Sequence, residues 1–149
     1  MRLGLQLIPE SAFYSNLRNA LGPRSWSALS KKIREENSYT CKYCPFIEDR
    51  SRRLYTHLHE VWEFDITTKT QKLVDFECIC PTCHSVHHWG LSRVQGKDMD
   101  YLLEHACEIN NCTRQQFEEH IKKSFSTWRD LSYIKWSLDF SLFPDIKIP

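Results

Sequence analysis

Two cysteine pairs, each separated by two residues, limit what this chain can fold into more than any other feature. Cys41 and Cys44 form the first pair, and Cys80 and Cys83 form the second. This spacing lets both sulfurs of a tight turn reach one metal ion, and two such turns complete the tetrahedral four-sulfur site that Zn²⁺ prefers. We therefore expect one structural zinc ion held by these four cysteines.

The segment between the two pairs has the composition of a strand pair. Leu54 to Phe64 and Gln71 to Ile79 are rich in the β-branched and aromatic residues that favour strands. The polar residues Thr67 to Thr70 separate them and predict a turn. The sequence thus predicts a β-hairpin between the two metal-binding turns.

A short helix is expected directly after the second cysteine pair. Pro81 suits the first helical turn, so we expect a helix over 82–89 with Gly90 as its terminator. On such a helix His84 and His88 are four residues apart and share a face. Zinc turn, hairpin and helix together predict a treble-clef (ββα-metal) unit within an α+β fold.

At 149 residues the chain is most simply one domain. Helical spacing of apolar residues predicts helices on both sides of the zinc unit, and alternation near the end predicts a half-buried strand. The expected parts are an N-terminal helical segment (1–37, helices at 11–21 and 26–36), the zinc-bound unit (38–92), and a C-terminal extension (93–149, helices from 98 and 113, strand 134–142).

Charge and cysteine content give weaker indications. The formal net charge is +1, which makes no global case for nucleic-acid binding, although residues 24–53 are locally basic. No signal peptide or long apolar stretch predicts a membrane association, so we expect a cytoplasmic protein with reduced thiols. Cys107 and Cys112 are expected to pack in or near the core. Cys78 would break the two-residue spacing of the second pair.

Several motifs resemble the zinc-containing branch of the HNH (ββα-metal) nucleases. They are Cys41-x-x-Cys44, then Leu58-His59-Glu60-Val61-Trp62, then Cys80-Pro-Thr-Cys83-His84-Ser-Val-His87-His88. The chain is most similar to a group of bacterial and phage HNH-like proteins with a Leu-His-Glu-x-Trp strand and a Cys-Pro-x-Cys-His helix. The similarity extends outward to residues 7–9, 15–18 and 128–139.

This resemblance implies an endonuclease that hydrolyses phosphodiester bonds in nucleic acid, with DNA as the expected substrate. It implies a second divalent metal (Mg²⁺, Mn²⁺, Ni²⁺ or Zn²⁺) beside the structural zinc. By position, His59, His84 and His88 take the places of the metal ligands, and Glu60 takes the place of the general base.

Two positions depart from the family pattern. The usual base is histidine, whereas this chain has Glu60, whose ordinary pKa near 4.3 makes it a weak base at neutral pH unless burial raises it. The asparagine expected before the second cysteine pair is absent from residues 75–79. The alternative function is therefore a catalytically inactive treble-clef module, or a phage-encoded inhibitor, that acts through protein or nucleic-acid contacts. RNA binding is a third, weaker option.

Arg50, Arg52 and Arg53 are the expected phosphate contacts, although an exposed charged loop would explain them equally well. We expect His87 to contact solvent or a phosphate. Of the other histidines, His57 shares a strand face with His59 and could extend the site, while His105 and His120 are expected on helix surfaces.

Overall fold

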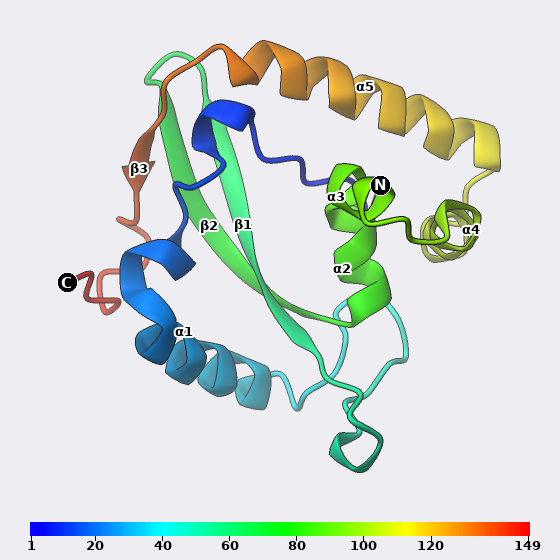
Figure 1. The fold of residues 1–149 in the computed structure, drawn as a ribbon, viewed down its shortest axis with the longest axis horizontal. Coiled ribbons are helices and arrows are strands. Elements are labelled where there is room, and N and C mark those ends of the chain that lie inside the picture. Colours follow the sequence, from blue (N-terminus) through cyan, green and yellow to red (C-terminus); the bar gives the residue numbers. More distant parts are fainter.

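The computed structural model describes residues 1–149 and shows an α+β protein. Figure 1 shows a long hairpin with helices on both sides of it. The elements follow the order α1 (Leu17–Glu36), β1 (His57–Asp65), β2 (Thr70–Ile79), α2 (Pro81–His87), α3 (Trp89–Val94), α4 (Met99–Asn110), α5 (Arg114–Ser132) and β3 (Ser137–Asp139), with short 3₁₀ turns at Glu10–Ala12 and Arg50–Arg52.

The sheet has three strands in the order β1-β2-β3. β1 and β2 are antiparallel, as the sequence predicts, and His59 lies opposite Glu77. The register shifts between Val61 and Trp62, which leaves an extra residue on β2 and marks a β-bulge. β3 is much shorter than the predicted strand 134–142 and pairs in parallel with β2.

α1 differs most from the sequence prediction. The predicted break between two helices is present, because Gly22 has a φ of 76° inside the segment and Pro23 follows it. The first part, however, starts at Leu17, after an Asn16 cap, and only a 3₁₀ turn occupies the predicted beginning of that helix.

Two apolar clusters hold the elements together. The larger one joins the cysteine turns to α2, α4 and α5, and the smaller one joins α1 to the hairpin and the C-terminal segment. Figure 1 shows the corresponding arrangement, with α1 and the C-terminus on one side of the hairpin and α2 to α4 on the other. The hairpin therefore belongs to both cores. No helix combines the length and apolar character needed to cross a membrane.

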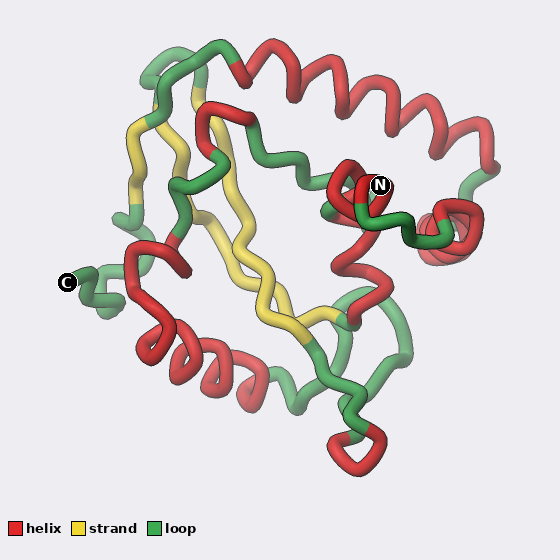
Figure 2. The backbone as a smooth tube through the Cα atoms, viewed as in Figure 1, coloured by secondary structure: helices red, strands yellow, loops and turns green.

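Loops carry several important residues. Figure 2 shows a long, mostly irregular connection between α1 and β1, which contains the first cysteine pair.

The predicted helix over 82–89 ends at His87, and Gly90 lies inside the following helix α3 instead of terminating α2. The N-terminal segment runs beside α2, where the Gln6 backbone N–H donates to the His87 carbonyl at 2.9 Å.

Candidate metal centres

The four paired cysteines form one group, as the sequence predicts. Their sulfurs all lie within 4.8 Å of one another. The Cys44 and Cys80 sulfurs are 3.6 Å apart, and the Cys44 and Cys83 sulfurs are 4.0 Å apart. In a tetrahedral site with Zn–S bonds of about 2.3 Å, neighbouring sulfurs are about 3.8 Å apart. The group therefore has the size of a four-sulfur zinc site.

Protonation of these thiols shows why the group needs a cation. Hydrogen bonds from Cys80 and Cys83 lower the pKa of Cys41, which makes Cys41 the first thiolate. Its hydrogen bond and charge then raise the pKa of Cys83 and, with burial, raise that of Cys80 to about 12. Four thiolates this close repel one another strongly unless a metal ion balances their charge.

A residue that the sequence assigns to a helix surface contacts this group. The Nε2 atom of His105, on α4, lies 3.2 Å from the Cys83 sulfur. The prediction that His105 is a surface residue was therefore wrong. Cys78 lies in β2 outside the metal-binding group, while Cys107 and Cys112 pack against the larger core as predicted.

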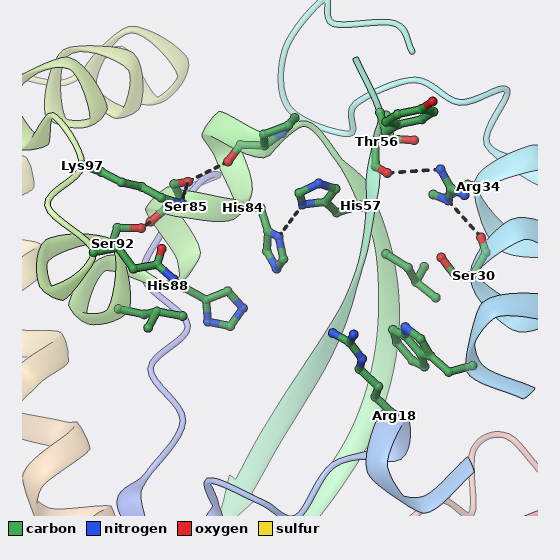
Figure 3. A pocket seen from close by; sticks show the side chains of 16 residues that line it. Arg18, Ser30, Arg34, Thr56, His57, His84, Ser85, His88, Ser92 and Lys97 are labelled. Atoms are coloured by element: carbon green, nitrogen blue, oxygen red, sulfur yellow. Dashed lines mark hydrogen bonds between the residues drawn. The ribbon is translucent and has the colours of Figure 1, made fainter. Parts of the chain in front are cut away.

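A second group consists of His59, His84 and His88, as the HNH resemblance implies. His59 comes from β1, His84 from α2, and His88 directly follows α2. One ring nitrogen of each lies within 4.8 Å of the others. Figure 3 shows His84 and His88 side by side on the wall of a pocket. Hairpin and helix thus bring together three side chains that can hold one metal ion.

All three imidazoles are held in the neutral form that binds metals. Burial, followed by the charge of His88, lowers the pKa of His84 to about 3. Burial and His87 lower the pKa of His88 to about 4. Burial, followed by the charge of His87, lowers the pKa of His59 as well, and the His87 ring is stacked on His59 at 4.7 Å.

Two neighbouring side chains orient these rings. The Gln6 carboxamide oxygen lies 2.8 Å from Nε2 of His59, so it accepts that N–H and leaves Nδ1 available. Nδ1 of His57 lies 2.8 Å from Nδ1 of His84, where one nitrogen donates to the other. The sequence suggests His57 as an extension of the site, but no sequence signal connects Gln6 with a residue more than fifty positions away.

The structure places Glu60 away from its predicted role. Its carboxylate accepts the backbone N–H groups of Leu17 at 3.2 Å and Arg18 at 2.9 Å, and the Trp62 indole N–H at 3.0 Å. Burial raises its pKa, against the effect of these donors. Glu60 is not in the three-histidine group. Its contacts attach the start of α1 to β1, and Glu60 also lines a cavity with His59, His84 and His88.

His87 is also in a different environment from the predicted one. It is 1% exposed, so the prediction of a solvent or phosphate contact was wrong. Its Nδ1 lies 2.6 Å from the Gly4 carbonyl and its Nε2 lies 3.0 Å from the Glu77 carboxylate. Both partners are hydrogen-bond acceptors, and they hold the ring in one orientation. Glu77 also accepts hydrogen bonds from Tyr43 and Lys42.

A pocket of about 570 Å³ opens beside the histidines, between α1 on one side and α2 and α3 on the other (Figure 3). None of its lining residues is acidic. Its positively charged residues are Arg18, Arg34 and Lys97, and His57, His84 and His88 also line it. An adjoining cavity, which shares Arg18, His84 and His88 with this pocket, is also lined by His59 and Glu60. The pocket therefore suits an anion that approaches His84 and His88.

The predicted phosphate-binding arginines do not line this pocket. Arg50 and Arg52 belong to the 3₁₀ turn before β1, and Arg53 follows it with a left-handed φ of 56°. Arg50 pairs with Glu48 at 3.1 Å and lies over the Tyr39 ring. The structure thus supports the interpretation of this loop as a charged surface segment.

Fold and site together define an α+β protein with a four-cysteine group able to hold a metal ion and a separate group of three histidines. Comparisons of the chain with protein-family models, curated protein sequences and solved structures find no match. The function must therefore be argued from these two groups and from the pocket beside them.

Proposed function

We propose that this protein is an HNH-like endonuclease that hydrolyses phosphodiester bonds, with DNA as its substrate. In this proposal the four cysteines hold a structural Zn²⁺ in a treble-clef unit, and the three histidines hold a second divalent metal. The observation that carries the proposal is the convergence of His59, His84 and His88, whose ring nitrogens lie within 4.8 Å of one another, at a cavity that Arg18 and Glu60 also line.

The ligand set favours certain metals. Three neutral imidazoles suit Zn²⁺ or Ni²⁺ better than Mg²⁺, which prefers oxygen ligands. When bound, such a metal supplies Lewis-acid stabilisation of a phosphate oxygen. The chain's own contribution is to hold the three rings neutral and oriented.

Digestion of plasmid and oligonucleotide DNA tests this proposal. The zinc-loaded protein is incubated with Ni²⁺, Mn²⁺, Zn²⁺ or Mg²⁺, and the same reactions are run with His59→Ala, His84→Ala and His88→Ala. We expect cleavage by the wild type, more with Ni²⁺ or Zn²⁺ than with Mg²⁺, and loss of cleavage in each variant. Lys122→Ala is the control, because Lys122 is exposed on α5 and does not line the pocket.

Two results would contradict the proposal. One is a wild-type protein that cleaves no nucleic acid with any of these metals. The other is unchanged cleavage after all three histidine substitutions, which would point to a contaminating nuclease. Circular dichroism and zinc content, measured on every variant, separate loss of the site from loss of the fold.

The alternative is a catalytically inactive, zinc-stabilised binding module. The contacts of Glu60 favour it, because they leave the expected base position without a free carboxylate. This alternative predicts binding of a protein or nucleic acid with no strand cleavage. The digestion experiment therefore also separates the two functions.

A further inference from the structure

The pocket beside the histidines carries positive charge on opposite walls. Arg18 extends from the first turn of α1, and Lys97 lies beyond the end of α3. Figure 3 shows the two side chains on opposite sides of the labelled histidines. The nearest carboxylate is Glu60, which lines the adjoining cavity with Arg18 but forms no ion pair with its guanidinium, and no acidic residue lines the pocket around Lys97.

Arg18 has no side-chain partner in the protein. Its backbone N–H donates to Glu60, but its guanidinium forms neither an ion pair nor a hydrogen bond. Arg34 on the same wall differs, because it pairs with Glu48 at 2.9 Å and donates to the Thr56 carbonyl at 3.2 Å. Arg18 is therefore the arginine of this wall whose charge remains available to a ligand.

Lys97 is held at the opposite wall by a neutral partner. Its ammonium donates to the Ser85 hydroxyl at 2.8 Å, and that hydroxyl donates in turn to the Pro81 carbonyl at 2.8 Å. These bonds fix the position of the charge without neutralising it. Lys97 is close enough to His84 and His88 that its charge contributes, after burial and nearby histidines, to lowering the pKa of both.

We propose that Arg18 and Lys97 bind the phosphates of a single nucleic-acid strand on either side of the phosphate that the histidine group holds. The inference rests on the proposed function and adds the substrate class: a strand with at least three consecutive phosphates, in place of a mononucleotide or dinucleotide. Cations on the two walls fix the path of the strand, since phosphate contacts position a nucleic acid without reading its sequence.

Salt-dependent binding tests this assignment. Fluorescence anisotropy measures the affinity of the zinc-loaded protein, without added divalent metal, for single-stranded DNA containing one, three or eight phosphates. We expect affinity to rise steeply from one to three phosphates and only slightly beyond. The binding constant K falls as the salt concentration rises. Each of Arg18→Gln and Lys97→Gln should make the slope of log K against log salt less negative by about 0.7, the value for one phosphate contact on a single strand.

The matched control is the double variant Arg52→Gln/Arg53→Gln, which removes the same charge from a loop outside the pocket. We expect its salt slope to equal that of the wild type, whereas Arg18→Gln/Lys97→Gln should make the slope less negative by about 1.4. The reverse pattern, or no length dependence, overturns the inference. RNA strands of the same lengths should behave alike if phosphates dominate, and an effect confined to one sugar overturns the phosphate assignment.

Cleavage assays distinguish failure of this inference from failure of the proposed function. If the wild type cleaves DNA but the pocket variants keep the wild-type salt slope, the strand path is wrong and the nuclease proposal stands. If no metal supports cleavage but the slopes change as expected, the nuclease proposal fails. Arg18 and Lys97 would then still form a strand-binding site, which supports the inference.

Discussion

Buried charge is concentrated at Glu77 and His87, beside the histidine group. Their side chains are 5% and 1% exposed, and they lie 3.0 Å apart. Burial works to raise the pKa of Glu77, but hydrogen bonds from His87, Tyr43 and Lys42 lower it to about 2 overall. This cluster occupies the region where the HNH resemblance expects an asparagine, and it positions the His87 ring against His59.

Glu77→Gln should destabilise the fold, because it removes the buried carboxylate that accepts hydrogen bonds from His87, Tyr43 and Lys42. Breaking a buried pair in this way costs about 3–5 kcal/mol. Since the pKa of Glu77 is lowered on folding, its stabilisation is fully present above about pH 4.5 and is lost as pH falls toward 2.

Urea unfolding at pH 7 and at pH 3 measures this effect. The difference between wild type and Glu77→Gln should be smaller at pH 3. Glu63→Gln is the matched control, because Glu63 is an exposed residue of β1, and it should change the free energy of unfolding by less than about 0.5 kcal/mol. Equal stability of Glu77→Gln and the wild type at pH 7 would show that the pair contributes nothing.

Gln6→Ala should weaken metal binding at the histidine group. Gln6 accepts the His59 Nε2–H, and losing such an orienting partner lowers metal affinity by about 10-fold to 100-fold. Calorimetric titration of zinc-loaded protein with Ni²⁺ measures the change. Gln115→Ala, on the exposed face of α5, should keep the wild-type affinity, and a Gln6→Ala affinity within twofold of wild type would contradict the role.

At the scale of elements, α1 depends on contacts that its own sequence does not reveal. Asn16 caps its first turn, and Glu60 from β1 accepts two more of its backbone N–H groups. The resemblance to HNH nucleases places Glu60 at the position of the general base, whereas in the structure its carboxylate accepts backbone N–H groups at the start of α1. A negative charge at this end also favours the helix dipole.

Glu60→Ala should therefore lower the free energy of unfolding by about 1–2 kcal/mol, the usual cost of losing an N-terminal cap. Thermal unfolding followed by circular dichroism measures the loss, with Glu63→Ala as the control. Glu60→Gln keeps one acceptor oxygen and should retain most of any DNA cleavage. Normal stability together with complete loss of cleavage in Glu60→Gln would instead restore Glu60 as a general base.

Elements with strong local signals are predictable from the sequence. The predicted hairpin agrees with the structure within a few residues, and the helix predicted from residue 113 is α5, where Thr113 and Gln116 form a capping box. The C-terminal strand is not, because alternation of Ile134 to Leu142 predicts burial of one face but not how far β2 extends beside it. Only Ser137–Asp139 finds a strand partner.

The site residues, too, are predictable from the sequence only where a local signal is present. Fixed spacing identified the four cysteines, and motif similarity identified His59, His84 and His88. The sequence did not predict the positions of His87 and His105, because these depend on burial and on distant partners. The buried His87 ring contacts Glu77, and the packing of α4 on α2 places His105 beside Cys83. These contacts join residues whose sequence separation carries no local signal.

On the scale of the whole molecule, the four-cysteine group joins the loop before the hairpin to the start of α2. Its sulfurs lie within the larger core, between Ile79 and α4. If zinc fills this group, its removal should unfold the protein, since structural zinc contributes about 10 kcal/mol or more of apparent binding free energy in small domains.

Cys80→Ser, and chelation of the wild type, should both give unfolded or insoluble protein. Zinc content by mass spectrometry and the circular dichroism spectrum measure the outcome. Cys112→Ser is the matched control, because Cys112 lies outside the metal-binding group. A folded, zinc-free Cys80→Ser protein would show that the cysteines serve another purpose.

The N-terminal segment is held in place by residues far away in the sequence. Leu3 hydrogen-bonds Asn110, the Leu5 N–H donates to His120, and the Ile8 carbonyl accepts from Trp128. Residues 3–8 thus depend on α4 and α5 for several of their contacts, in addition to their contacts with His87 in α2. A chain truncated before α5 should therefore lack part of the support for Gln6, the residue that orients His59.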